Sequence, residues 1–197
     1  GVGYSQMTRK GRFRGSTART FLSRAKKRRG VRIETEAFVT GLIFENKRCV
    51  GVKFTQKGKE HEILAGKEVV LSGGAVNSPH ILQVSGIGPQ EHLQSIGINT
   101  LHDLPGVGRN LQDHYVSRIS HRVENTDSIN QLSRGIRLLR EIGSWAFQGK
   151  GALTFGITSA MVFSRSREGL SSPDIQLLFT PASYSQKTHG ELEKEGG

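Results

Sequence analysis

The stretch Gly73–Gly88, GGAVNSPHILQVSGIG, places a glycine pair, a Ser-Pro step and a Ser-Gly-x-Gly around one short apolar segment. It follows Glu68–Leu71, whose apolar run predicts a strand covered on both faces, as in a parallel α/β sheet. Ligands of open α/β sheets bind beyond the carboxyl ends of the strands. We therefore predict that Ser72–Ala75 lies where a ligand can approach bare backbone.

A helix is predicted to follow this strand. Asn77 or Ser78 can cap a helix that begins at Pro79, because the fixed φ and missing N–H of proline suit the first helical position. Such a helix presents unpaired amides and a positive dipole end to the same sheet edge. The segment Ser85–Pro89 ends the helix, since one of its glycines can adopt the left-handed conformation of a C-cap. From the residues alone, the segment is either a site for a flat anionic ligand or a packed corner.

Upstream of this stretch, the pattern predicts a helix and then an antiparallel meander. Ser16 can cap a helix over residues 17–29, which Gly30 closes. Three strand candidates follow, at residues 31–46, 49–56 and 61–74, with turn signals at 45–48 and 57–60.

Downstream, the composition shifts between Asp113 and Val123. Residues 127–149 then read as an amphipathic helix, and two strand candidates follow at Ile157–Phe163 and Ile175–Phe179. The helix would carry Ile136, Leu139, Ile142 and Trp145 on one side.

Charge is unevenly spread along the chain, which carries a net charge of +11 over 197 residues. Residues 1–32 hold eleven Lys or Arg and no acidic residue, with Lys26–Arg29 at the centre. This basic tract is either a module that binds nucleic acid or acidic surfaces, or a solvated helix end whose cations complement the helix dipole. No helix-turn-helix or zinc-finger spacing appears, so we expect no nucleic-acid partner.

The sequence offers no signal for a disulfide framework, a metal site or a transmembrane helix. The single cysteine, Cys49, excludes an internal disulfide framework, and we interpret it as a half-buried strand residue. The seven histidines have no metal-cluster spacing, so no metal ligand is predicted. No stretch approaches the roughly 20 apolar residues of a transmembrane helix. The compartment is left open by the sequence, and the cytoplasm is the expected one.

The residues from Gly74 to Gly88 resemble the second signature of the glucose-methanol-choline (GMC) oxidoreductases, with every constrained position filled. Segments on both sides agree with the family in order: Gly11–Ser16, Val50–Val52, Leu104–His114, Gly151–Thr154 and Pro173–Leu177. The resemblance covers essentially the whole chain, is closest to the choline and alcohol dehydrogenase type, and places these residues as an internal fragment of a longer enzyme.

The resemblance implies an α/β (α+β) fold with FAD as the cofactor. Residues 1–114 would form part of a Rossmann-like FAD-binding domain with a β-meander, lacking the N-terminal Gly-x-Gly-x-x-Gly unit. Residues 115–197 would begin an antiparallel-sheet substrate-binding domain. The catalytic histidine of the family lies outside this chain, so the resemblance assigns no catalytic residue here.

Ten residues match cofactor-binding positions of the family. Val39 would pair with the adenine of FAD through its backbone. The residues at the strand end and at the helix start would pass close to the cofactor, and the loop with Asn110, Asp113 and His114 would approach it from the domain junction. The predicted set is Val39, Ser72, Gly73, Gly74, Ala75, Ser78, Pro79, Asn110, Asp113 and His114. The loop residues have competing interpretations: Asn110 as a turn former, Asp113 as a cap and His114 as a satisfied polar residue.

The implied reaction oxidises a small-molecule alcohol to an aldehyde or ketone by hydride transfer to flavin N5. Reduced flavin would pass its electrons to oxygen, a quinone or another carrier, and the sequence does not select among them. Choline-type members carry a carboxylate where this chain has Ser159, which favours a neutral alcohol. The isolated segment is predicted to be inactive.

Overall fold

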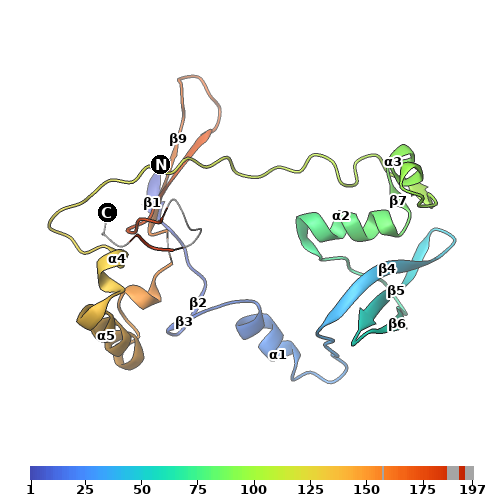
Figure 1. The fold of residues 1–197 in the computed structure, drawn as a ribbon, viewed down its shortest axis with the longest axis horizontal. Coiled ribbons are helices and arrows are strands. Elements are labelled where there is room, and N and C mark those ends of the chain that lie inside the picture. The colour runs from blue at the N-terminus through green and yellow to red at the C-terminus, as the bar shows by residue number, and fades with distance from the viewer. Residues whose placement is uncertain (157, 186–190, 194–197) are drawn as a thin grey trace. The chain divides into compact units, whose positions relative to one another are not determined.

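The computed structural model describes residues 1–156, 158–185 and 191–193 (Figure 1). Its contacts divide the chain into two units, one made of Gly1–Val31 with Ser117–Gly197 and the other of Arg32–Val116. This grouping differs from the predicted division after residue 114, because the first 31 residues join the second part of the chain. The assignment of residues 1–114 to FAD binding and 115–197 to substrate binding stays a prediction.

An antiparallel meander forms one part of the unit Arg32–Val116. Strands β4 (Ala37–Glu45), β5 (Arg48–Gln56) and β6 (Lys59–Leu64) pair in the order β4-β5-β6 (Figure 1). The two turns contain residues with positive φ, Asn46 at 56° and Gly58 at 73°. The predicted meander and both of its turns are therefore confirmed, with shorter outer strands: the first begins at Ala37 rather than at residue 31, and the third ends at Leu64 rather than at residue 74.

The meander is stabilised by contacts between β5 and β6. Phe54 is buried on β5, and the ring of His61 stacks on it with the centroids 5.2 Å apart. Lys53 and Glu62 face each other in register, and their side chains form an ion pair of 3.1 Å. Cys49 is half-buried on β5, as predicted.

The predicted buried strand at Glu68–Leu71 is wrong. The segment has no regular structure, and Val70 is 76% exposed. A β-strand exists only when a partner satisfies its backbone, and no strand among the described residues pairs with this segment. Apolar composition alone could not specify such a partner.

Helix α2 (Gly74–Val84) starts earlier than predicted (Figure 1). Its N-cap is Gly73, so neither Asn77 nor Ser78 caps it, and Pro79 lies inside the helix rather than at its first position. The chain turns at Gly74, where φ is +83°, and the helix follows directly, which places Pro79 in the second turn. The cost is one backbone hydrogen bond, because proline has no N–H to donate.

Beyond α2, the chain forms a small module around one buried side chain. Gly86 has φ +84°, which confirms the left-handed C-cap expected of this segment. Strand β7 (Ile87–Gly88) pairs in parallel with β8 (His102–Asp103), and helix α3 (Gln90–Ser95) lies between them in sequence. Leu93 on α3 is completely buried and forms the centre of this module.

The other unit contains a second antiparallel sheet. Strands β1 (Val2–Tyr4), β9 (Ala160–Ser164) and β10 (Ile175–Phe179) pair in the order β1-β9-β10, and β2 (Arg9–Lys10) pairs with β3 (Phe13–Arg14). The predicted strand at 175–179 is confirmed. The strand predicted at 157–163 begins at Ala160, and Ile157 lies outside the described residues.

The predicted helix over residues 17–29 is shorter than expected. It consists of the π-helical turn η1 (Ala18–Leu22) and α1 (Ser23–Ala25). Thr17 directly precedes η1 and makes no side-chain cap bond, whereas Ser16 Oγ accepts from the Arg19 N–H at 3.4 Å, as expected of the predicted cap. Beyond α1, backbone bonds run from residue i to i−3, which tightens the chain into turns before Gly30, where φ is +87°.

The predicted amphipathic helix at 127–149 is broken into pieces. These are α4 (Ile129–Leu132), α5 (Gly135–Gly143) and the π-helical η2 (Ser144–Gln148), followed by the short η3 (Ala152–Thr154). The break occurs because Arg134 is extended and Gly135 has φ +54°. Three members of the expected apolar face are exposed, Ile136 at 72%, Leu139 at 62% and Ile142 at 42%, while Trp145 is half-buried.

Candidate functional site

The predicted ligand edge, Ser72–Ala75, lies at the beginning of helix α2, and its glycines are exposed. The first backbone N–H groups of an α-helix have no partner within the helix, and here no side chain caps them. A side chain at Gly74 would meet no atom within 4 Å, because the space in front of this residue is open. The edge therefore combines unpaired donors, a positive helix end and free access, which fits an anionic cofactor group.

Helix α2 is held against strand β4 by Ser85. The Leu42 N–H donates to Ser85 Oγ at 2.9 Å, and this hydroxyl donates to the Ile81 carbonyl at 2.6 Å. A register shift in β4 between Val39 and Gly41 precedes this contact. The structure thus brings the strand of Val39 and the helix of Gly74 together within one unit, while the backbone role of Val39 stays a prediction.

Substitution of Ser85 by alanine is expected to lower the free energy of unfolding by about 1–3 kcal/mol, since it leaves the Leu42 N–H without its partner. Denaturant unfolding of the variant measures this difference. Ser95→Ala is the matched control, because the Ser95 hydroxyl donates to the His92 carbonyl on the exposed surface of α3. Equal losses in the two variants would contradict a special role for Ser85.

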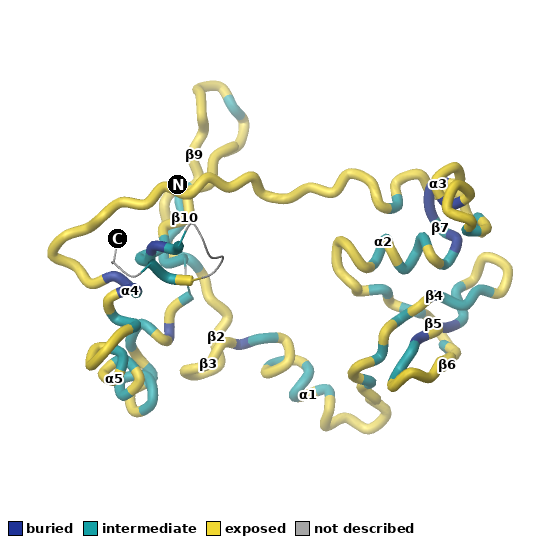
Figure 2. Tube along the Cα trace, in the orientation of Figure 1, coloured by how far each residue is buried: buried dark blue, intermediate teal, exposed yellow. Residues whose placement is uncertain are grey.

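The predicted loop residues Asn110, Asp113 and His114 lie in an extended, exposed segment that Figure 2 shows in yellow. The His114 N–H donates to Asp113 Oδ1 at 2.7 Å, and Asn110 has φ +58°. Within the described part of the chain, no hydrogen bond joins these three side chains to β4 or to residues 72–79. Their approach to the cofactor therefore stays a prediction, and the turn-forming interpretation of Asn110 agrees with its backbone.

Gln83 connects several segments of this region, and the sequence did not predict its role. Its side chain contacts Gly88 and Gly108 and bonds to the Val107 carbonyl. The sequence carried no signal for this role, because the hydrogen-bond partner of Gln83 lies 24 positions away along the chain.

Among the residues that the structure describes, two carboxyl groups have a perturbed pKa, and both lie outside the predicted site. A hydrogen bond from Gln56, and then one from Arg32, lower the pKa of Glu34. Asp174 has its pKa lowered by Ser166, whose hydroxyl donates to Oδ2 at 2.6 Å and whose N–H donates to Oδ1 at 2.8 Å. Neither pattern resembles an acid–base pair prepared for catalysis.

Ser166→Ala is expected to raise the pKa of Asp174 toward its ordinary value, because the largest stabilising bond to the carboxylate is lost. The depressed pKa contributes stability above the unfolded-state value, and this contribution disappears as pH falls through the folded-state value. The variant should therefore show a smaller loss of folding stability than the wild type as pH falls through the acidic range. NMR titration of the Asp174 carboxyl measures the shift, and an unchanged pKa would contradict the assignment.

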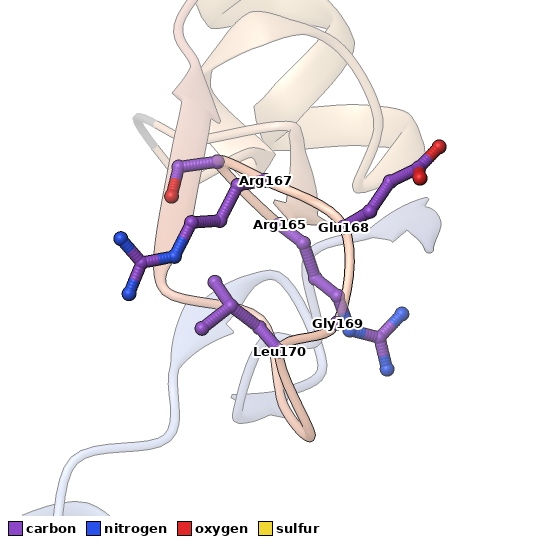
Figure 3. Close-up of a pocket in the computed structure, with 6 residues that line it drawn as sticks. Arg165, Arg167, Glu168, Gly169 and Leu170 are labelled. Carbon is purple, nitrogen blue, oxygen red and sulfur yellow. The ribbon is translucent and has the colours of Figure 1, made fainter.

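A pocket of about 520 Å³ lies in the β9–β10 loop near Ser166 (Figure 3). It is lined by Arg165, Ser166, Arg167, Glu168, Gly169 and Leu170. Figure 3 shows the side chains of Arg165 and Arg167 directed to opposite sides of Leu170. The two cations therefore do not converge on one anion in this pocket.

The basic tract lies on the surface, with Lys26–Arg29 exposed directly after α1. The ring of Phe13 within this tract is engaged by other side chains of the protein. It packs edge-on against Trp145, and the Arg19 guanidinium lies 4.5 Å from its centroid. Exposure of the four cations fits both interpretations of the tract, the solvated helix end and the binding module, so the choice between them stays a prediction.

Neither a metal cluster nor a membrane-crossing helix accompanies the predicted site in the described structure. Among residues 1–156, 158–185 and 191–193, no three or more His, Cys, Asp or Glu side chains gather as a metal site would require. In the same described part, every helix is too short or too polar to cross a bilayer.

Comparison with known proteins places these features in a family. The sequence profile described as GMC oxidoreductase matches residues 1–116. The chain is 38% identical over 190 residues to the oxygen-dependent choline dehydrogenase of Chromohalobacter salexigens, covering 96% of this chain and 34% of that protein. It is also 38% identical over 185 residues to the mitochondrial choline dehydrogenase of Homo sapiens, covering 92% and 31%.

Solved structures give the same result. An FAD-dependent oxidoreductase from Chaetomium thermophilum superposes with a TM-score of 0.71 at 26% identity, covering 83% of this chain and 30% of the other. The chain spans about a third of the length of the curated relatives that it matches. Since the family profile covers more than half of the chain and the relatives align with nearly all of it, this chain belongs to the GMC oxidoreductase family.

Proposed function

We propose that the chain forms one side of the flavin site of an FAD-dependent oxidoreductase that oxidises an alcohol to an aldehyde or ketone. One observation carries this proposal: Gly74 has open space in front of it, a φ of +83°, and a place at the exposed start of a helix. A cofactor phosphate or ring can approach the backbone there, because glycine has no side chain to block it.

The residues present fit FAD in three ways. The amides at Gly73–Ala75 offer donors to an anionic group, and Val39 offers main-chain groups on the strand packed against the same helix. Asn110, Asp113 and His114 follow a turn that is bonded to the other end of α2. The redox chemistry, acceptance of a hydride at flavin N5, is supplied by FAD when it is bound.

The substrate we favour is a neutral alcohol. Ser159 stands where the resemblance expects a carboxylate in choline-type members, and a hydroxyl offers no counter-charge to a quaternary ammonium group. The backbone of Ser159 is held in the sheet, because its carbonyl accepts from Ser5 and its N–H donates to the Phe179 carbonyl. A quaternary ammonium alcohol is the second candidate, which the choline dehydrogenase relatives support.

These two substrates can be separated with a matched pair. Choline and its neutral isostere 3,3-dimethyl-1-butanol have the same shape and differ in charge. We expect the FAD-loaded enzyme to have the higher kcat/KM for the neutral alcohol. Ser159→Glu should raise the choline preference by about fivefold, since one partly screened charge pair contributes on the order of 1 kcal/mol. A wild-type preference for choline would overturn the neutral-alcohol proposal.

The cofactor itself is tested separately by the absorbance of the purified enzyme. We expect correctly folded enzyme to show the absorbance band of bound flavin, and we expect denaturation to release this flavin as FAD. Folded protein without this band would overturn the proposed function whatever its substrate.

A further inference from the structure

The side chain of Gln83 fills the space between two glycines from different segments. A Cβ atom at Gly88 would lie 3.1 Å from Gln83 Cγ, and a Cβ atom at Gly108 would lie 2.6 Å from Gln83 Nε2. Gly108 also has φ +78°. The half-buried glutamine therefore occupies the room that both glycines leave, and the three residues form one packed contact.

The amide of Gln83 is also bonded to the turn that contains Gly108. Nε2 donates to the Val107 carbonyl at 3.2 Å. Within this turn, the Val107 N–H donates to the Leu104 carbonyl, and the Leu104 N–H in turn donates to the Gly88 carbonyl at 3.0 Å. The turn Pro105–Gly108 is thus attached to the C-terminal end of α2 by packing and by hydrogen bonds.

This attachment lies just before the predicted cofactor loop. The exposed residues Asn110, Asp113 and His114 begin two positions after Gly108, and within 110–116 the structure gives the local bond from His114 to Asp113. Gln83 is therefore the side chain that connects the start of this loop to the helix beginning at Gly74.

We propose that Gln83 is a positioning residue for the cofactor site: by holding the turn Pro105–Gly108 against helix α2, it sets where the loop at Asn110–His114 begins. The inference rests on the proposed flavin function. Because Gln83 sits at one end of α2 and Gly74 at the other, a rigid helix carries both the exposed edge and the attached turn. Loss of the amide would free the turn without removing any group at that edge.

Three variants of the FAD-loaded enzyme test this role. Gln83→Leu keeps the bulk of the side chain and removes the donor to the Val107 carbonyl. Gln83→Glu keeps the shape and places a carboxylate against that carbonyl. Gln94→Leu, the same substitution at an exposed site on α3, is the matched control.

Three measurements are compared. FAD release, followed by flavin fluorescence, should accelerate by about five- to tenfold in both Gln83 variants and remain unchanged in the control. Hydrogen exchange of the amides in residues 104–109, measured without FAD, should also accelerate in the Gln83 variants. Visible circular dichroism of the bound flavin should change, because this signal reports the surroundings of the cofactor.

The outcomes separate this inference from the proposed function. A flavin-loaded wild type whose Gln83→Leu variant releases FAD at the same rate would overturn the inference alone. Faster release with unchanged exchange at residues 104–109 would show that the turn is not what holds the cofactor, and would also overturn it. A folded wild type that binds no FAD would overturn the proposed function and this inference with it.

Discussion

Gly74→Val is expected to weaken FAD retention by the enzyme strongly while leaving most of the fold intact. The open space in front of Gly74 would receive a β-branched side chain, and a cofactor could no longer approach the backbone there. Steric insertion of this size costs about 1–3 kcal/mol, which corresponds to binding weakened roughly fivefold to 150-fold. The ratio of flavin to protein after purification measures the effect.

Gly97→Val provides the control for backbone strain. Gly97 has φ +77°, close to that of Gly74, and a Cβ atom added to it would likewise meet no atom within 4 Å. Both variants should therefore lose similar stability from the left-handed backbone, and only Gly74→Val should lose flavin. Normal flavin content in Gly74→Val would show that this glycine serves the turn and not the cofactor.

Gly86→Val is expected to destabilise the module after α2 by about 2–5 kcal/mol. A valine there would have an unfavourable backbone at φ +84°, costing about 1–2 kcal/mol, and overpacking adds about 1–3 kcal/mol. The added Cβ would lie 2.7 Å from the Asn99 carbonyl oxygen, which is backbone and cannot swing away. The midpoint of urea unfolding measures the loss.

The same Gly97→Val variant separates the two contributions at Gly86. It carries the backbone strain without the collision, so it should lose about 1–2 kcal/mol. Equal destabilisation of Gly86→Val and Gly97→Val would show that the backbone at Asn99 moves aside. The parallel pairing of β7 with β8 argues against such movement.

The meander shows why some of the fold was predictable. Its turns depend on local backbone conformations that Asn46 and Gly58 adopt readily. Its strands pair with their neighbours in the sequence and have partly alternating apolar and polar residues. The start of α2 was not predictable in the same way. Pro79 has a strong preference for the first helical turn, yet Gly74 begins the helix upstream and the proline is accepted inside it.

The candidate site, like the fold, was only partly predictable from the sequence. The glycines and the Ser-Pro step indicate the family from the amino-acid sequence, because each depends on a residue type, but the sequence left open whether they form a ligand site or a packed corner. The exposure of Ser72–Ala75 came from the structure, which lacks the buried strand expected before it. The loop residues Asn110, Asp113 and His114 were chosen by resemblance, and their placement against a cofactor remains a prediction.

The sequence by itself determined the turns of the meander, a left-handed glycine within Ser85–Pro89 and the family signature, because these depend on the conformational freedom and type of single residues. The structure then chose Gly86 over Gly88 for the left-handed backbone. Only the tertiary structure decided that Ser85 receives the Leu42 N–H and that Gln83 holds the Val107 carbonyl. Each of these bonds joins residues far apart in the chain, 43 positions in the first case and 24 in the second, and such a partner is chosen by the packing of whole elements. A serine or glutamine carries no mark of that partner in its own sequence neighbourhood.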